Sequence, residues 1–190
     1  MKKSLLLVFL VTMLWNHPAL AIEAADHDAF FLSGGTANIT VKNSDDLISG
    51  TTLAGGYRLG LFSILFIEVG YGNVAYAKTV NIDGVLKDVS FRTTGANAGA
   101  GFVLPIRKTR LGFKYVRNPK NKWVEEVVDQ ETNVSESNIS GDIDFTTRML
   151  FGQFQEGIFE IGIRQDEIRE TDSVLDTSMG VYAMINIKLK

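Results

Sequence analysis

Isolated charged side chains recur within apolar or glycine-rich segments of this 190-residue chain. A charge in a water-poor interior is costly unless it is paired and hydrogen-bonded. We therefore predict one interior network of bases and acids, whose members are Arg58, Arg92, Lys114, Arg148, Arg164, Glu68, Asp144 and Glu160. We favour a structural role, in which the network fixes the strands, over a path for ions or protons.

Catalytic and metal chemistry find little support in the remaining residues. The chain has no cysteine, and beyond its first 21 residues its only histidine is His27, in the segment that leads into the first strand. A histidine there is a poor general base. Asp45 and Asp46, or Glu125 and Glu126 with Asp129, offer carboxylates for Ca²⁺, but their spacing favours solvated loop charge. We predict no enzyme, no cofactor and no metal site.

The segment 118–140 is the most distinctive candidate for surface contact. Its apolar residues stand beside charges, and long loops on a rigid scaffold are where binding residues usually lie. We predict a partner-binding tip, or a short hairpin that extends the fold, with contact residues Trp123, Val124, Val127 and Val128. The alternative is that Trp123 belongs to an aromatic girdle at a membrane interface.

The elements that must position these residues show a period of two, which is typical of β-strands with two different sides. We predict eight strands, at 28–41, 49–61, 64–77, 88–103, 107–117, 141–153, 157–168 and 177–190. Tight turns near 62–63, 105–106 and 155–156 alternate with longer polar loops around 42–48, 78–87, 118–140 and 169–176. This alternation is typical of an all-β, antiparallel up-and-down barrel in an outer membrane. Strands 28–41 and 88–103 lack clean alternation.

The two sides of these strands differ in composition. One side is rich in Leu, Ile, Val and aromatic residues, whereas the other combines Gly and Ala with the isolated charges. Small residues leave room for long charged chains in a narrow lumen, which predicts that the apolar side faces lipid. In strand 141–153 we assign Met149 and Phe151 to the apolar side, and Asp144 and Arg148 to the lumen.

The N-terminus predicts the compartment. Lys2 and Lys3 precede an apolar run that ends at Ala19-Leu20-Ala21, which is the pattern of a cleaved signal peptide over residues 1–21. Its loss removes two lysines and no acid, so the formal net charge moves from −3 to −5. We expect a single barrel domain over 22–190 and no nucleic-acid partner.

The segment Gly55-Gly56-Tyr57-Arg58-Leu59, followed by Phe66-Ile67-Glu68-Val69-Gly70-Tyr71, resembles the second and third strands of small eight-stranded outer-membrane barrels. These proteins form the OmpA transmembrane-domain and OmpX/Ail group. The resemblance implies that Arg58 and Glu68 are lumen charges, and that the chain acts as a structural or adhesive protein of a Gram-negative outer membrane. Such proteins usually end on an aromatic residue, whereas this chain ends on Leu189-Lys190.

The partners expected from this interpretation are outer-membrane lipid including lipopolysaccharide, the barrel-assembly machinery, and host or surface ligands, with the chain itself a monomer. The alternative is a soluble periplasmic barrel of lipocalin-like shape, whose apolar side faces inward and binds an apolar ligand. A lipid-modifying enzyme is disfavoured because no predicted strand carries a histidine.

Overall fold

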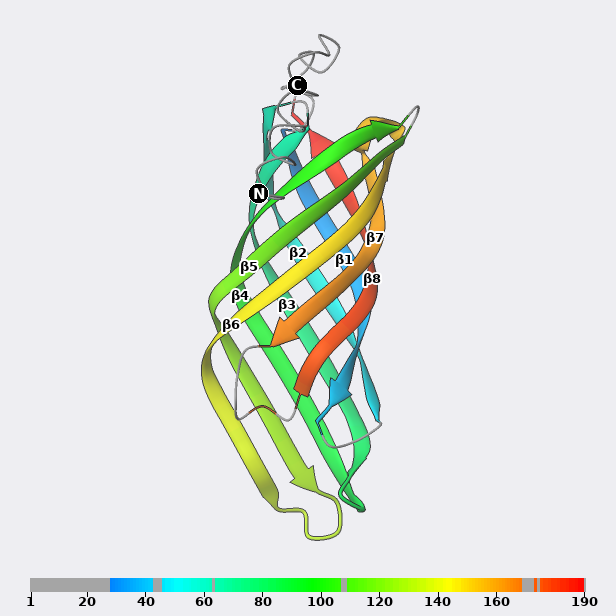
Figure 1. Cartoon of the computed structure of the whole chain (residues 1–190). Coiled ribbons are helices and arrows are strands. Elements are labelled where there is room, and N and C mark those ends of the chain that lie inside the picture. Colours follow the sequence, from blue (N-terminus) through cyan, green and yellow to red (C-terminus); the bar gives the residue numbers. More distant parts are fainter. Residues whose placement is uncertain are drawn as a thin grey trace, which may run out of the picture.

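A computed structural model describes residues 28–42, 46–62, 64–106, 109–168, 173 and 175–189. Their strands are β1 (Ala29–Val41), β2 (Leu47–Phe62), β3 (Leu65–Ile82), β4 (Val85–Ile106), β5 (Thr109–Asp129), β6 (Ser135–Phe154), β7 (Phe159–Ile168) and β8 (Leu175–Lys188). Each strand pairs antiparallel with its neighbours, and β1 pairs with β8 (Figure 1). The predicted eight-stranded antiparallel barrel is confirmed. The proposed signal peptide, His27 and Asp45 lie outside the described residues.

The strands are strongly tilted. The pairing, followed once around the barrel, leads back to β1 ten residues further along, through Ala29, Arg58, Glu68, Gly99, Val116, Thr147, Asp166, Ser178 and Ile39. A stagger of this size over eight strands corresponds to a tilt of about 40° and to an interior that side chains can fill.

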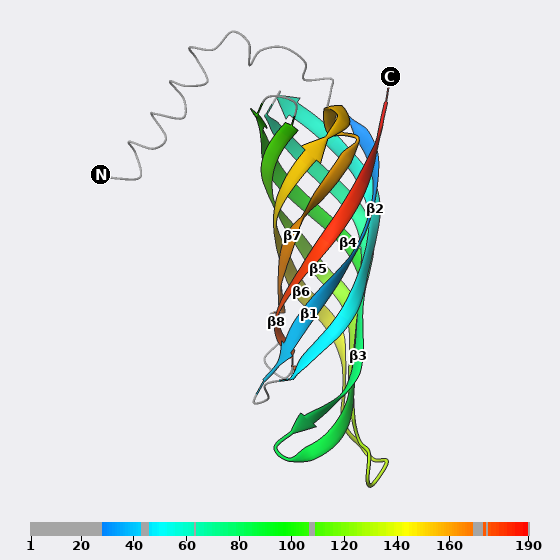
Figure 2. The same ribbon diagram turned by 90° about the vertical axis from the view of Figure 1, so that its right-hand side faces the viewer.

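The two ends of the barrel differ. Residues at the start of β1 and the end of β8 lie together at the end with short connections, where the 3₁₀ turn Gln155–Gly157 joins β6 to β7. The long hairpins β3–β4 and β5–β6 project from the opposite end (Figures 1 and 2). The predicted alternation of short and long connections is therefore present.

Segments 78–87 and 118–140, which we predicted as loops, are mostly strand. Asp83 and Gly84 both have positive φ, 53° and 87°, and form a two-residue turn between β3 and β4. Such a turn matches the twist of the flanking strands and lets their pairing continue to the tip. In the second segment, β5 continues to Asp129 and β6 begins at Ser135, so the alternative of a hairpin that extends the barrel is the correct one.

The two strands with irregular sequence patterns alternate regularly between inner and outer face, although the pairing of β1 with β8 shifts register between Ile39 and Val41. In β1, Phe31 points into the barrel while Phe30 and Leu32 point outward. In β4, Phe91 and Val103 both lie inside, although the pairing with β5 is interrupted between Thr94 and Ala98. The clusters of adjacent apolar residues reflect strands that carry apolar side chains on both faces.

Near the short-turn end, large apolar side chains point outward from every strand. We call these outward residues the apolar band; one from each strand is Leu32, Leu59, Val69, Phe102, Phe113, Leu150, Ile161 and Ile185. In β2 the band runs from Leu53 to Leu61, about nine residues. A tilted strand needs about 9–11 residues to cross a bilayer.

Beyond the apolar band the two sides exchange character. In β1 the outward residues become Thr36, Asn38 and Thr40, while Ala37, Ile39 and Val41 turn inward and are buried. Residues 73–94 and 121–144, with the neighbouring ends of the other strands, continue this arrangement; we call this part the extension. Its interior holds a large cluster of buried apolar residues that includes Val74, Phe91, Trp123, Ile143 and Leu175.

Among the described residues, no helix is long and apolar enough to cross a membrane.

Candidate functional site

Four charged side chains meet inside the barrel at the level of the apolar band. Arg58 of β2, Glu68 of β3, Lys114 of β5 and Glu160 of β7 are each between 0 and 4% exposed. Arg58 Nε donates to Glu68 Oε1 at 2.7 Å and its Nη2 donates to Glu160 Oε2 at 2.8 Å. Lys114 Nζ lies 2.8 Å from Glu160 Oε1 and 3.5 Å from Glu68 Oε2. Two cations and two anions thus alternate, and the group has no net charge.

Further polar groups complete the coordination of Glu160. The Tyr182 hydroxyl donates to Oε1 at 2.7 Å, and Gln153 Nε2 donates to Oε2 at 3.0 Å. Together with Arg58 and Lys114, they give this carboxylate four donors from four strands. A buried carboxylate with this many donors is a rigid joint between the strands that supply them.

Aromatic rings and a glycine surround the same network. The Arg58 guanidinium lies 4.2 Å from the centre of the Phe66 ring, and Lys114 Nζ lies 5.1 Å from the centre of the Tyr182 ring. Gly101 faces this space, because a Cβ there would come within 2.5 Å of Phe66 and 2.8 Å of Lys114. The glycine-rich inner face therefore provides the room that the sequence pattern predicted.

Arg164 lies inside the barrel but further toward the extension. Its Nη2 donates to Asp166 Oδ1 at 2.7 Å, and the Thr147 hydroxyl donates to the same oxygen at 2.7 Å. Asp166 was not among the predicted lumen residues, although it lies two residues after Arg164 and therefore on the same face of β7. Gln153 and Tyr182 were not predicted either. In the sequence, only their alternating positions along β6 and β8 could have indicated that they point into the barrel.

Arg164 is thus paired apart from the four-charge network, and three further predicted members lie on the outer face of the barrel. Arg92 is exposed on the outer face of β4, between buried Phe91 and Thr93. Arg148 and Asp144 of β6 also lie away from the lumen network, where Arg148 Nη2 pairs with Glu167 at 3.1 Å and Asp144 pairs with Arg117. These positions correct the sequence prediction.

The error in β6 has a physical cause. Phe151 is 2% exposed and Met149 packs against the inner cluster, whereas Leu150 is 56% exposed and points outward. Both faces of this strand carry large apolar residues, so its period alone does not say which face is inside. Arg148 and Asp144 are outward because they lie where the outer surface changes from apolar to polar.

The contact residues predicted for segment 118–140 separate onto two faces. Trp123 and Val127 are each 3% exposed and belong to the apolar cluster inside the extension, so neither forms a surface tip or a membrane girdle. Trp123 packs against Phe91 with ring centres 5.8 Å apart. Val124 is 50% exposed on the outer face, and Val128 is half-buried.

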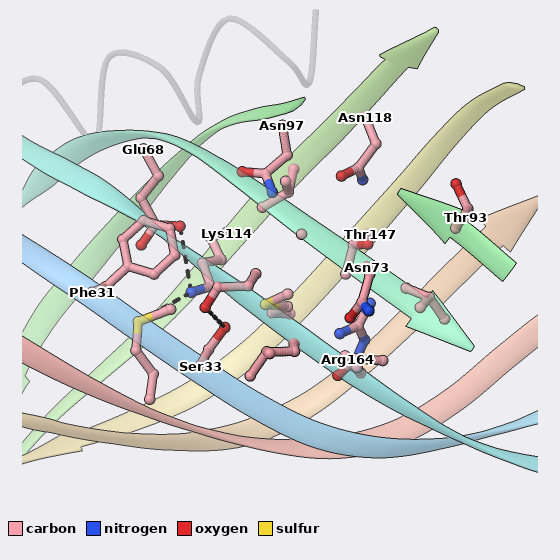
Figure 3. A pocket seen from close by; sticks show the side chains of 18 of the residues that line it. Phe31, Ser33, Glu68, Asn73, Thr93, Asn97, Lys114, Asn118, Thr147 and Arg164 are labelled. Carbon is pink, nitrogen blue, oxygen red and sulfur yellow. Dashed lines mark hydrogen bonds and ion pairs between the residues drawn. The ribbon is translucent and has the colours of Figure 1, made fainter. Parts of the chain in front are cut away.

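A small polar cavity separates the charge network from the apolar cluster. Its volume is about 50 Å³, and its lining includes Glu68, Lys114, Asn118, Thr147 and Arg164 (Figure 3). This space suits one or two water molecules. The side-chain oxygen of Asn121, which also lines the cavity, is buried without a protein partner and is a natural site for such a water. The lumen is therefore filled in three layers: charges, a small polar space, and apolar side chains.

Titratable groups of the extension are tuned by burial and by local hydrogen bonds. Burial, reinforced by the negative charge of Asp166, raises the pKa of Tyr76 to about 12. At the β5–β6 tip, the backbone N–H of Thr132, with that of Glu131, lowers the pKa of Asp129. A hydrogen bond to Glu136 raises the pKa of the Lys87 amine.

The pKa of Tyr76 makes the extension sensitive to strongly alkaline pH. Because the folded state raises this pKa, its stabilisation is fully present below pH 10 and is lost as the pH rises toward 12. We expect a loss of about 2–3 kcal/mol of stability across that range. Fluorescence of Trp123 at increasing pH measures it. The Tyr76→Phe variant should lose this dependence; an unchanged alkaline transition in the variant would contradict the assignment.

Among the described residues, no group of three or more His, Cys, Asp or Glu side chains gathers as a metal site would require.

Two solved structures share this architecture. Neisserial surface protein A (NspA) superposes with a TM-score of 0.54 at 10% identity, and Ail, the attachment invasion locus protein of Yersinia pestis, with 0.51 at 15%. In each case the match covers 84% of this chain and 97% of the other. Both are small eight-stranded outer-membrane barrels, so the resemblance seen in the sequence holds for the fold. The Ail crystal structure contains the heparin analogue sucrose octasulfate.

No protein-family model and no curated protein sequence matches the chain.

Proposed function

We propose that this chain is an integral outer-membrane barrel that does not conduct, and that it carries a rigid extension into the medium for surface contact. The exchange of sides along the strands is the observation that supports this most strongly. Side chains of the apolar band point outward over a length that fits a bilayer, and polar residues replace them beyond it. Only a barrel that leaves the membrane partway along its strands needs this arrangement.

A filled lumen supports the absence of transport. The charge network blocks the barrel at the level of the apolar band, the polar cavity is only about 50 Å³, and buried apolar residues fill the extension. Eight-stranded barrels have interiors just wide enough for side chains. We expect the purified protein to leave a planar bilayer non-conducting.

We propose no catalytic activity, because the described residues contain neither histidine nor cysteine, and the buried carboxylates of Glu68, Glu160 and Asp166 are paired with Arg58, Lys114 and Arg164. Export by a signal peptide over 1–21, insertion by the barrel-assembly machinery, contact with lipopolysaccharide, and a monomeric state complete the proposal. The soluble lipocalin-like alternative is disfavoured, since it would expose the whole apolar band to water.

Cysteine labelling tests the location and orientation, because the chain contains no native cysteine. The variants are Ser140→Cys in the extension, Leu150→Cys in the apolar band and Gln155→Cys at the short turns. With a membrane-impermeant maleimide on intact Gram-negative cells, we expect labelling of the first only. Lysis should add Gln155→Cys, and denaturation should add Leu150→Cys.

The unmodified chain is the background control for this experiment. Labelling of Leu150→Cys in native protein, together with recovery in the soluble periplasmic fraction, would overturn the membrane location. Labelling of Gln155→Cys but not Ser140→Cys on intact cells would reverse the orientation.

A further inference from the structure

Four charged side chains surround Thr146 on the outer face of the barrel. Thr146 of β6 lies opposite Arg117 of β5 and opposite Glu167 of β7. Within β6, Asp144 precedes it by two residues and Arg148 follows it by two, so both share its face of the strand. Arg117 pairs with Asp144, and Arg148 Nη2 lies 3.1 Å from Glu167 Oε2. We call these four charged residues the outer ring.

The centre of the outer ring holds a hydroxyl without a partner. Thr147 lines the polar cavity inside the barrel, so its neighbour Thr146 points outward. Thr146 is nevertheless only 1% exposed, and its Oγ1 has no hydrogen-bond partner among the described residues. Leaving a buried hydroxyl unpaired is unfavourable. The side chains around it are 38 to 56% exposed, so an incoming group needs to displace only flexible side chains to reach it.

The outer ring lies where the apolar band ends. On the side of the band, Leu150 of β6 and Ile163 of β7 are 56 and 50% exposed. On the side of the extension, Gly141 and Asp142 are exposed. Figure 1 shows β5, β6 and β7 side by side, with β7 ending while the other two continue. A lipid whose acyl chains cover the apolar band therefore places its headgroup at the outer ring.

The charges of the outer ring indicate which headgroup fits. It combines two guanidinium groups with two carboxylates, so a purely anionic group is attracted by the arginines and repelled by the acids. A zwitterionic headgroup complements both. Guanidinium groups bind phosphate through parallel hydrogen bonds, and carboxylates accept strong hydrogen bonds from a primary ammonium. Phosphoethanolamine carries these two groups, a phosphate and an ammonium, on one short chain.

The neighbouring hairpin strengthens this selection. Residues 124–142 include no lysine or arginine and carry six acids, namely Glu125, Glu126, Asp129, Glu131, Glu136 and Asp142. Glu125 is buried, and the other five lie nearer the surface. A surface of this charge beside the outer ring disfavours polyanionic headgroups and favours one that ends in an ammonium.

We propose that the outer ring binds the phosphoethanolamine headgroup of a membrane lipid. Arg117 and Arg148 bind its phosphate, and the Thr146 hydroxyl donates to a phosphate oxygen. Asp144 and Glu167 accept hydrogen bonds from its ammonium group. The headgroup thus replaces two exposed ion pairs, which are weak, and also satisfies the buried hydroxyl. This inference rests on the proposed membrane location of the apolar band.

Native mass spectrometry of the purified barrel in a non-ionic detergent tests the binding. Phosphatidylethanolamine, phosphatidylcholine and phosphatidylglycerol with identical acyl chains are added together in equal amounts. Phosphatidylcholine keeps both charges but has no N–H to donate, and phosphatidylglycerol keeps only the negative charge. We expect bound phosphatidylethanolamine to exceed each of the other two lipids by about fivefold.

Variants locate the preference at the outer ring. Thr146→Val removes the hydroxyl but keeps the shape of the side chain, and should lower the preference to about twofold without loss of stability. Arg148→Gln with Glu167→Gln should abolish it. The matched control is Lys122→Gln with Asp142→Asn, a cation and an acid that lie opposite each other on the exposed surface of the extension. This control should keep the full preference, and the heat-dependent gel shift verifies that all variants fold.

Several outcomes would overturn the proposal. Equal binding of phosphatidylethanolamine and phosphatidylcholine would mean that the ammonium is not recognised. A preference for phosphatidylglycerol would reduce the interaction to attraction of phosphate by arginine. An equal loss in the control variant would place the site elsewhere. Glycerophosphoethanolamine, which has the same headgroup without acyl chains, should not displace the lipid at equal concentration; displacement would identify a soluble ligand instead.

Failure of this site is distinguishable from failure of the proposed membrane location. Labelling of Leu150→Cys in the native protein would overturn the location, whatever the lipid preference. Protection of Leu150→Cys together with equal binding of all three lipids would overturn the headgroup site alone.

Discussion

Replacing Glu160 by glutamine is expected to lower the free energy of unfolding by about 3–5 kcal/mol, the cost of leaving buried charges without a partner. Glu160 is fully buried, and it accepts from Arg58, Lys114, Gln153 and Tyr182. The amide removes one of two anions that balance two buried cations inside the barrel. Urea unfolding in lipid vesicles, followed by the loss of the heat-dependent gel shift, measures the change.

Two further variants separate the buried charge from other effects. Asp144→Asn removes one partner of a surface ion pair whose side chains are 39 and 56% exposed, and should cost less than about 1 kcal/mol. The double variant Lys114→Met with Glu160→Gln leaves the neutral pair of Arg58 and Glu68. It should recover most of the lost stability, since removing both charges avoids the unpaired one. A double variant no more stable than Glu160→Gln would contradict this account.

The second large effect is expected at Trp123. Its replacement by alanine should destabilise the extension by about 3–5 kcal/mol, because a large side chain that is 3% exposed leaves a cavity among Phe91, Val127 and Ile143. The rate of proteolysis within 124–142 measures this local opening. The membrane part of the barrel should retain its heat-dependent gel shift.

Val124→Ala is the matched control, because this neighbouring residue is 50% exposed on the opposite face of β5. Its replacement should change the rate of cleavage by little, as is usual for surface substitutions. If Trp123 were a contact residue at the surface, the two substitutions would have similar small effects on proteolysis. That outcome would support the interpretation made from the sequence, in which Trp123 is a contact residue of a partner-binding tip.

The prediction of strand order succeeded because the period of two and the turn residues are local properties. Eight strands, their antiparallel order, and short turns at one end all follow from such patterns. Strand ends were less accurate in β3 to β6, since polar residues on the outer face of the extension resemble loop residues. Residues of the same strands that point to the other side, such as Val80 of β3 and Val89 of β4, are buried and keep the inner face apolar as far as the tip.

For the interior network, the sequence predicted the right residues where one face of a strand is clearly apolar. Arg58, Glu68, Lys114 and Glu160 stand on such strands and meet in space. Arg92, Asp144 and Arg148 lie on β4 and β6, where both faces carry large apolar side chains. On such strands, the alternation of residues along the chain shows which residues share a face, but it does not show which face points into the barrel.

What the sequence by itself determined is a set of two-sided strands, their order, and the acidic character of 124–142. Only the tertiary structure decided which side of each strand points into the barrel. It also decided the level along the barrel axis at which the outer face changes from apolar to polar and the inner face from polar to apolar. Closure of a tilted, staggered barrel places residues from eight strands at one level. Whether a side chain meets lipid, water or the lumen depends on that level, which no single strand encodes.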